Sequence, residues 1–336
     1  MRAFLSLFFL ALLTCFGVGY YALFANNISS SRTTSYVNIP NGSEFIDVLK
    51  LLKEKRILEN EATFALWAKQ KGYDQAVKSG RYHFSKRMNN REIVNMLLAG
   101  RQSLVSFSLF DIKNKSEFAS LIGRKFEIDS LTWIQFLEEY DYTTYDLKNS
   151  NSIAFFVNET YESKWNSTPT DLMNMFEERY KSFWSNERNE KLKDLGMTKG
   201  SVVTLASIVE KECMKADEMP KVAAVYINRL KIGMPLQADP TLKFATGDFN
   251  AKRVLNWHKE FDSPYNTYKN RGLPPGPICI PRKNAIDAVL NHDLHDYIYF
   301  CANPDMSGYS VFSTNLDEHN KVAVAYRNRL NEMNVK

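Results

Sequence analysis

The sequence contains little cysteine and lacks the short motifs that mark several common enzyme classes. Its 336 residues include four cysteines, and Cys15 lies in an apolar N-terminal run, so the other three cannot form a disulfide framework. One bridge between Cys279 and Cys301 stays possible, beside the alternative of buried free thiols. The sequence has no HExxH pattern and no glycine-rich phosphate loop, which argues against a zincin-type protease and a P-loop nucleotide enzyme.

Charge of one sign is not concentrated anywhere in the sequence. The 43 Lys and Arg residues against 38 Asp and Glu residues give a formal net charge of +5. No basic run with interleaved aromatics is present, so we do not expect nucleic acid as a partner. Hydrophobic residues make up 44% of the chain and charged residues 24%, which is typical of one or two ordinary globular domains.

The longest apolar run lies at the N-terminus. Residues 3–25 carry no charge, and the only charged side chain before them is Arg2. A helix of that length, at about 1.5 Å per residue, spans a bilayer core, and Tyr20 and Tyr21 suit the membrane interface near its outer end. The run is long for a signal peptide, and no A-x-A cleavage site follows it. The sequence therefore predicts an uncleaved transmembrane anchor over residues 1–25, with the polar body outside the cytoplasm.

A linker and a small α+β module are predicted after the anchor. Residues 26–35 are polar, which is typical of a membrane-proximal linker. The pattern Asn-x-Ser-Glu-Phe occurs at 41–45 and at 114–118, each time between an alternating stretch and a helical periodicity. The serine of each copy is a natural helix N-cap, so each copy predicts a strand–turn–helix unit. We place the module at residues 36–126.

The remainder, residues 127–336, is predicted to be a mixed α+β domain with long loops. It begins with a helical connecting segment over 127–200. Within this segment, an amphipathic pattern predicts one long helix around 169–194. The boundary between module and domain rests on little sequence contrast.

Further helices are predicted at about 201–215 and 219–231. A long tract over 232–283 follows, which holds seven of the eleven prolines and has few regular patterns. A loop of that length inside a compact domain is usually functional. A strand at 297–303, a hairpin-like segment at 310–315 and a final helix complete the domain.

The stretch LASIVEKEC (205–213) carries three consecutive charges directly after an apolar run. On a helical wheel Lys211 faces solvent, whereas Glu210 and Glu212 lie on the two flanks of the apolar stripe. A carboxylate at such a boundary is suited to general acid catalysis, because partial burial raises its pKa while one side stays open to substrate. The wheel alone does not choose between the two glutamates.

Five segments of the second half carry a resemblance to a known family. They occur in the order LASIVEKEC (205–213), KVAAVYINRLKIGMPLQADPT (221–241), SPYNTYKNRGLPPGPICIP (263–281), YIYFCAN (297–303) and FSTNLDEHN (312–320). Together they closely resemble the endolytic murein transglycosylases, the YceG-like family, and the resemblance covers essentially the whole chain. It implies an N-terminal membrane helix, a LysM-like α+β module over 36–126 and a catalytic domain over 127–336.

The resemblance also implies roles for single residues. Glu210 corresponds to the catalytic glutamate of the family. The motifs that line the family's glycan cleft correspond here to Gln237, Asp239, Tyr265, Asn266, Thr267, Tyr268, Gly276 and Asn315. No metal ligand and no cofactor is implied.

The implied reaction is cleavage of the MurNAc–GlcNAc bond within nascent peptidoglycan strands. Ordinary glycosidases need two carboxylates, but here the attacking group is the C6 hydroxyl of the sugar itself. Glu210 would act first as acid and then as base, leave 1,6-anhydro-MurNAc ends and terminate strand elongation. The implied partners are glycan strands and membrane-bound peptidoglycan synthases. The implied location is the cytoplasmic (inner) membrane, crossed once, with the catalytic domain on its outer, periplasmic side.

Three other function classes fit the sequence less well than this one. The stretch 292–296 offers ligand-type residues for a metal hydrolase, but its His-x-x-His spacing is not that of a zincin helix. A cysteine hydrolase built on Cys213 lacks a recognisable His or Asn partner. A non-enzymatic wall anchor would use the LysM-like module alone, and the presence of Glu210 within its full motif argues against it.

Overall fold

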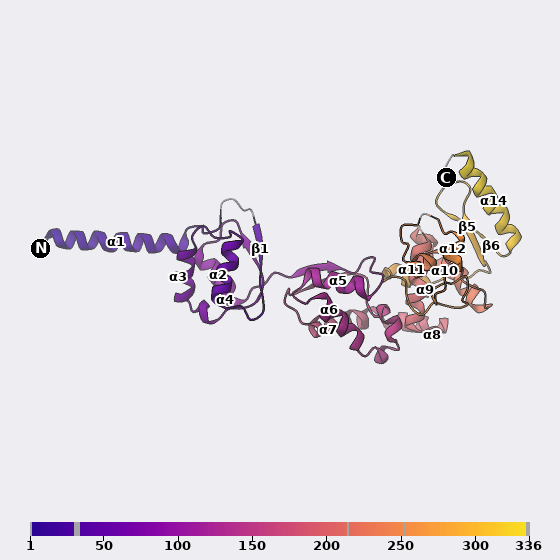
Figure 1. The fold of residues 1–336 in the computed structure, drawn as a ribbon, viewed down its shortest axis with the longest axis horizontal. Coiled ribbons are helices and arrows are strands. Elements are labelled where there is room, and N and C mark those ends of the chain that lie inside the picture. Colours follow the sequence, from indigo (N-terminus) through magenta and orange to yellow (C-terminus); the bar gives the residue numbers. More distant parts are fainter. Residues whose placement is uncertain (1, 30–33, 214, 252, 334–336) are drawn as a thin grey trace. The chain divides into compact units, whose positions relative to one another are not determined.

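The computed structural model describes residues 2–29, 34–213, 215–251 and 253–333 (Figure 1). The chain divides into two compact units. The first comprises Met1–Phe107, Gly123–Asp129 and Glu162–Thr168, and the second comprises Ser108–Ile122, Ser130–Tyr161 and Pro169–Lys336. Both units mix helices with small two-stranded sheets, so the α+β prediction is confirmed.

The predicted N-terminal segment forms a single helix, α1 (Arg2–Phe24). Within the described part of the chain, no helix is both long and apolar enough to cross a membrane. The helix is therefore confirmed, and its function as a transmembrane anchor stays a prediction.

Residues 26–29 hold the end of α1 against the first unit. Asn27 is 4% exposed, and its side-chain amide donates to Asn90 Oδ1 at 2.6 Å and to the Asn60 carbonyl at 3.0 Å. Its backbone N–H donates to the Met88 carbonyl at 3.0 Å. This part of the predicted linker is thus packed into the module, because its polar groups find buried partners there.

The first unit packs helices against a two-stranded sheet. Strands β1 (Thr34–Ile39) and β2 (Gly80–Ser85) pair antiparallel, with Val37 opposite Tyr82. Both residues are fully buried, together with aliphatic side chains from the helices. The helices are α2 (Phe45–Glu54), α3 (Glu61–Gln70) and α4 (Asn90–Ala99), with a short 3₁₀ turn η1 (Tyr73–Gln75).

The two Asn-x-Ser-Glu-Phe copies do begin helices, but the predicted serine caps are wrong. The N-cap of α2 is Glu44, whose backbone N–H donates to the Asp47 carboxylate at 2.9 Å. The first turn of α5 (Lys115–Lys125) is capped by Asn114, which accepts from the Glu117 N–H at 2.9 Å. In both cases a side chain longer than that of serine accepts a hydrogen bond from a free N–H group at the start of the helix.

The second unit is mainly helical. Its strands β5 (Tyr299–Ala302) and β6 (Ser310–Ser313) form a two-stranded sheet. A further two-stranded sheet pairs β3 (Val105–Ser108) with β4 (Thr160–Ser163), and each of these two strands has residues in both units. The remaining elements are α6 (Ser130–Glu139), η2 (Thr143–Tyr145), η3 (Asn149–Phe155), α7 (Pro169–Phe183), α8 (Asn186–Leu195), α9 (Lys199–Glu212), η4 (Ala216–Glu218), α10 (Met219–Lys231), α11 (Asp239–Thr246), α12 (Asn256–Glu260), α13 (Lys283–Leu290) and α14 (Leu316–Glu332).

Two predictions about these elements are corrected. The long helix expected at 169–194 is two helices, α7 and α8, because Ser185 caps a new helix by accepting from the Arg188 N–H. The proline-rich tract 232–283 contains two short helices, and Pro240 stands in the first turn of α11, where its fixed φ is favourable. The predicted helix at 219–231 coincides with α10.

Helix α9 forms the centre of the second unit. It packs against α10, α11, α13 and η3, and every residue from 202 to 209 is at most 3% exposed. Thr198 caps its start by accepting from the Ser201 N–H at 3.1 Å. The helix ends at Glu212, so its last turn leaves the core and carries the charged residues.

Gly276 lies where two backbone segments meet. A Cβ at this position would come within 2.8 Å of the Ser150 carbonyl oxygen and 3.0 Å of the Asn151 Cα. We expect Gly276→Ala to lower the free energy of unfolding by about 1–3 kcal/mol, because backbone atoms have to move. Urea unfolding followed by circular dichroism measures this.

Gly200→Ala is the matched control for this prediction. A Cβ there meets only the ends of the Asn151 and Leu147 side chains, which can rotate, and alanine favours a helix by up to about 1 kcal/mol. Equal destabilisation by both substitutions would contradict the backbone argument at Gly276.

Candidate active site

The three charged residues at the end of α9 have different surroundings. Glu210 accepts a hydrogen bond from the backbone N–H of Arg282 at 2.5 Å and pairs with its guanidinium Nε at 3.2 Å. The side chain of Glu210 is 7% exposed. Lys211 is exposed, as the wheel predicts, and forms an ion pair with Asp111. Both oxygens of Glu210 are therefore engaged by one arginine.

Glu212 lies on the other flank and has the surroundings of a general acid. The residue as a whole is half-buried, but its carboxylate is removed from bulk water. Burial and, after it, the negative charge of Asp239 raise the pKa of Glu212 to about 7, against the opposing effects of its hydrogen bonds and of the charge of Arg229. The Tyr226 hydroxyl donates to Glu212 Oε1 at 3.1 Å, which fixes the orientation of the carboxylate.

Asp239 and Tyr268 form a second pair beside Glu212. Asp239 is the first residue of α11, and it accepts a hydrogen bond from the Tyr268 hydroxyl at 2.6 Å. Burial raises the pKa of Tyr268 well above its usual value, so the phenol stays a donor. The LQADP and YNTY segments are thus brought together next to Glu212.

A cavity of about 320 Å³ opens on Glu212. One wall comes from Glu212, Cys213, Glu218 and Val222. The other wall comes from the β5–β6 hairpin and Tyr326 of α14. A carboxylate with a raised pKa on the wall of a concave site is the arrangement expected of a catalytic acid.

Asn266 and Thr267 of the YNTY segment have buried structural contacts. They are 0% and 1% exposed. The Asn266 side-chain amide donates to the carbonyls of Phe261 at 2.8 Å and Lys259 at 2.9 Å. Thr267 Oγ1 accepts from the Ala238 N–H at 3.0 Å. These contacts fix the turn that carries Tyr265 and Tyr268.

The other residues that the resemblance places in the cleft have backbone, capping or packing contacts. Gln237 is exposed at φ 48°, and its N–H donates to the Thr267 carbonyl at 3.0 Å. Asn315 is the N-cap of α14 and accepts from the Glu318 N–H at 3.0 Å. Gly276 is buried against the start of η3.

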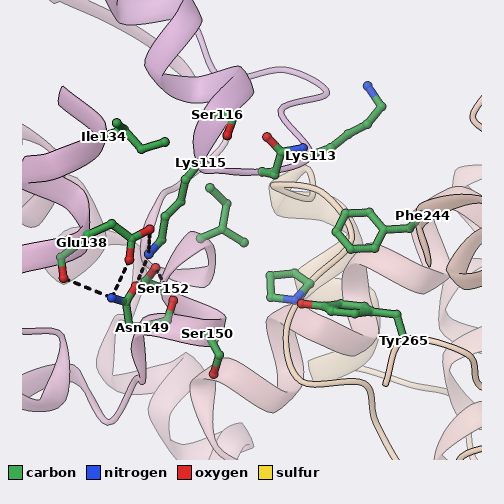
Figure 2. Close-up of a pocket in the computed structure, with 13 residues that line it drawn as sticks. Lys113, Lys115, Ser116, Ile134, Glu138, Asn149, Ser150, Ser152, Phe244 and Tyr265 are labelled. Atoms are coloured by element: carbon green, nitrogen blue, oxygen red, sulfur yellow. Dashed lines mark hydrogen bonds and ion pairs between the residues drawn. The ribbon is translucent and has the colours of Figure 1, made fainter. Parts of the chain in front are cut away.

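Tyr265 faces a different cavity, of about 420 Å³ (Figure 2). Its ring packs against Phe244 with centroids 4.7 Å apart. Lys115, Glu138 and Asn149 lie on the opposite side of this cavity in Figure 2. The two tyrosines of the YNTY segment therefore have different surroundings: Tyr265 lines this cavity, and Tyr268 bonds to Asp239.

Sequence reasoning missed Tyr226, Arg229 and Glu218. All three follow Glu212 in the sequence. Tyr226 bonds to Glu212, the charge of Arg229 lowers the pKa of Glu212, and Glu218 lines the same cavity. Tyr226 is 1% exposed and Arg229 7% exposed. A polar residue on the apolar stripe of a predicted helix was the available signal, because such a group requires a buried partner.

The residues considered for rival chemistries have other contacts. His292 Nδ1 lies 3.2 Å from the Val289 carbonyl oxygen, and His295 Nε2 lies 3.1 Å from that of Lys221. Among the described residues, no group of three or more His, Cys, Asp or Glu side chains could hold a metal ion. The cysteines Cys213, Cys279 and Cys301 are free thiols, and burial raises the pKa of each.

Comparison with known proteins gives a consistent family. The YceG-like family matches residues 37–325. An endolytic murein transglycosylase of Bacillus subtilis (strain 168) is 32% identical over 321 residues, which are 90% of this chain and 87% of that protein. The endolytic murein transglycosylase of Streptococcus pneumoniae (serotype 2, strain D39) is 26% identical, over 97% of this chain and 65% of that protein.

A solved structure is also similar. The 2.6 Å crystal structure of a yceG-like protein from Listeria monocytogenes superposes with a TM-score of 0.56 and 26% identity, covering 86% of this chain and 98% of that one. The segments shared with these proteins include the helix that ends in Glu210, Lys211 and Glu212, since the family match spans it. The chain therefore belongs to the YceG-like family, whose members among its homologues are endolytic murein transglycosylases.

Proposed function

We propose that the protein cleaves the MurNAc–GlcNAc bond inside nascent peptidoglycan strands, leaves 1,6-anhydro-MurNAc ends and so terminates strand elongation. Family membership supports the enzyme class, a lytic transglycosylase, which is a lyase. The observation that carries the mechanism is the environment of Glu212. Its pKa of about 7 is close to the value at which one group can both donate and accept a proton near neutral pH.

The reaction needs two proton transfers through one carboxyl group. Protonated Glu212 donates to the glycosidic oxygen as the bond from that oxygen to C1 of MurNAc breaks. The resulting carboxylate then takes the proton from the C6 hydroxyl of the same sugar, while its oxygen forms the new bond to C1. Intramolecular attack supplies the proximity advantage, so no second carboxylate is required for a water molecule.

The neighbours of Glu212 support this role. The Tyr226 hydroxyl holds the carboxylate in place. The negative charge of Asp239, which is bonded to Tyr268, disfavours a second negative charge on Glu212 and also stabilises positive charge that develops on the sugar.

Glu210 stays the alternative catalytic residue. The sequence argument assigns the role to it, whereas the contacts favour Glu212, because Arg282 occupies both oxygens of Glu210. In our proposal Glu210 holds the backbone at Arg282, at the end of the Pro-Pro-Gly-Pro-Ile segment, and so supports the site from behind.

Single substitutions distinguish the two glutamates. We expect Glu212→Gln to lower the yield of anhydro-muropeptides by at least roughly 10²–10⁴-fold, because the amide keeps the shape but cannot transfer the proton. Glu210→Gln keeps an acceptor for the Arg282 N–H and should lower activity by less than about 10-fold. Mass spectrometry of digested peptidoglycan measures the yield.

Circular dichroism of both variants is the folding control. A large loss in Glu210→Gln together with near-normal activity in Glu212→Gln would assign the catalysis to Glu210. Full activity in both variants would remove the single-carboxylate mechanism.

The activity should depend on pH through Glu212. Since the protonated form acts first, kcat/KM should fall as pH rises through about 7, the pKa of Glu212. Asp239→Asn removes the neighbouring negative charge but keeps the backbone hydrogen bond of residue 239 to Glu212. The pKa of Glu212 should therefore fall by roughly 0.5–1 unit, and the fall of kcat/KM at high pH, the alkaline limb of the profile, should begin at a lower pH. A pH–rate profile on solubilised glycan strands measures this shift.

Tyr268→Phe serves as the comparison for Asp239→Asn. It removes the phenol but leaves the charge of Asp239, so the limb should not move to lower pH. An alkaline limb that keeps its position in Asp239→Asn would contradict the assignment of this limb to Glu212.

We further propose that α1 anchors the protein in the cytoplasmic membrane, with both units outside the cytoplasm, where peptidoglycan synthases extend the strands. The uncharged run over 3–25 and its helical structure support this. The LysM-like module of this proposal is residues 36–126, most of which lie in the first unit.

The full chain should fractionate with membranes and resist extraction by salt. A chain that begins at Asn26 should be soluble and folded, whereas one that begins at Ser35 should unfold at a lower temperature, because it lacks Asn27 and its buried hydrogen bonds. Recovery of the full chain from the soluble fraction would contradict the anchor.

A further inference from the structure

A cavity of the first unit is lined by cationic side chains. It measures about 560 Å³, and its lining residues come from β2, from α4 and from the stretches that follow each of them. All of these residues lie between 83 and 103, so the cavity belongs to the first unit alone. Arg87 and Arg101 line it, together with the imidazole of His83 and the hydroxyls of Ser85 and Ser103. Such a set of donors suits a phosphate group.

The positive charge of this cavity is not neutralised within the part of the chain that the structure describes. Arg87 and Arg101 are both exposed, and neither guanidinium group forms an ion pair or a hydrogen bond with a described residue. Glu92 supplies the negative charge among the lining residues, but its Oε2 already accepts from the Asn89 N–H at 3.0 Å. The two arginines are therefore available to an anionic ligand.

Cations outnumber acids throughout this part of the first unit. Residues 81–101 include five cationic side chains and one acidic side chain, Glu92. The cations are spread along the segment, so they form no basic run in the sequence, and the fold brings two of them to one cavity. The five are Arg81, Lys86, Arg87, Arg91 and Arg101.

The two-stranded sheet holds one wall of the cavity in place. His83 of β2 packs on Tyr36 of β1, with ring centroids 4.8 Å apart, and these two residues are direct partners in the strand register. The Arg81 guanidinium lies 4.1 Å from the centre of the same Tyr36 ring. Cross-strand contacts of this kind restrict the rotation of both rings, so the imidazole of His83 has a defined position at the cavity.

The cavity adjoins the end of α1, which packs against α3 and α4 (Figure 1). Beyond the helix, the Asn27 N–H donates to the Met88 carbonyl at 3.0 Å, and Met88 also lines the cavity. The Arg91 guanidinium lies 5.8 Å from the centre of the ring of Phe24, the last residue of α1. With α1 in the membrane, as proposed above, this edge of the first unit lies at the level of the lipid headgroups.

We propose that the cavity of Arg87, Arg101 and His83 binds the headgroup of an anionic phospholipid at the outer surface of the membrane. The arginines pair with the phosphodiester, whereas a headgroup that also carries a cation is disfavoured, because its positive charge would face the same arginines. This inference rests on the proposed anchoring by α1. It adds a second attachment to the membrane, which limits the tilt of the first unit relative to the membrane surface.

Native mass spectrometry of the full chain tests this site. The chain is released from detergent micelles during titration with phosphatidylglycerol, phosphatidylcholine or inorganic phosphate, and the bound molecules are counted. We expect phosphatidylglycerol to bind more tightly than the other two. Arg87→Gln and Arg101→Gln should each weaken its binding by roughly 5-fold, the usual contribution of one basic residue at an anionic lipid surface. Binding of phosphatidylcholine should not change.

Arg56→Gln is the matched control. Arg56 is exposed and directly precedes Ile57, whose carbonyl accepts from the Ser29 N–H at 2.9 Å, so it also lies near the end of α1. It does not line the cavity, and its substitution should leave phosphatidylglycerol binding unchanged. Equal weakening by Arg56→Gln would indicate diffuse attraction and overturn the site. Inorganic phosphate bound as tightly as phosphatidylglycerol would overturn the lipid as its ligand.

Failure of this site and failure of the proposed function give different results. Full phosphatidylglycerol binding by both cavity variants, in a chain that fractionates with membranes, would overturn the site and leave the anchor intact. Recovery of the full chain from the soluble fraction would overturn the anchor and the headgroup site together. The yield of anhydro-muropeptides from solubilised strands should be the same in both cavity variants as in the unsubstituted chain, because the cavity lies in the first unit and Glu212 in the second.

Discussion

The chemistry of the site depends on the burial of α9. Because every residue from 202 to 209 is at most 3% exposed, the helix is fixed within the second unit, and its end at Glu212 is fixed with it. A carboxylate at that boundary loses part of its hydration but still faces a cavity. These are the conditions under which the pKa of a carboxylic acid rises while its proton remains available to a ligand.

The long proline-rich tract is held by buried side chains rather than by regular secondary structure. Ser207 Oγ accepts from the Ile278 N–H at 3.0 Å, and Glu210 accepts from the Arg282 N–H at 2.5 Å. Asn266 and Thr267 provide the same support to the turn between α12 and the Pro-Pro-Gly segment. Backbone groups that no helix or strand satisfies are thus paired, which keeps Tyr265 and Tyr268 in defined positions.

Local patterns predicted the helices well and their ends less well. The apolar run at the N-terminus and the periodicities near 201–215 and 219–231 predict the helices α1, α9 and α10. The caps were harder to predict, because Asp47 and Asn114 compete with nearby serines for the same free N–H groups. A single serine, Ser185, divided a helix that periodicity alone predicts as continuous.

The sequence by itself determined that two glutamates flank one apolar stripe at the end of a helix, since a period of 3.6 residues follows from the order of residues alone. It also determined the family, through motifs that keep their order. Only the tertiary structure decided what each glutamate meets: Arg282 beside Glu210, and Tyr226 with Asp239 beside Glu212. These partners are distant in sequence, and a pKa depends on burial and on charges in space, so no local pattern could supply it.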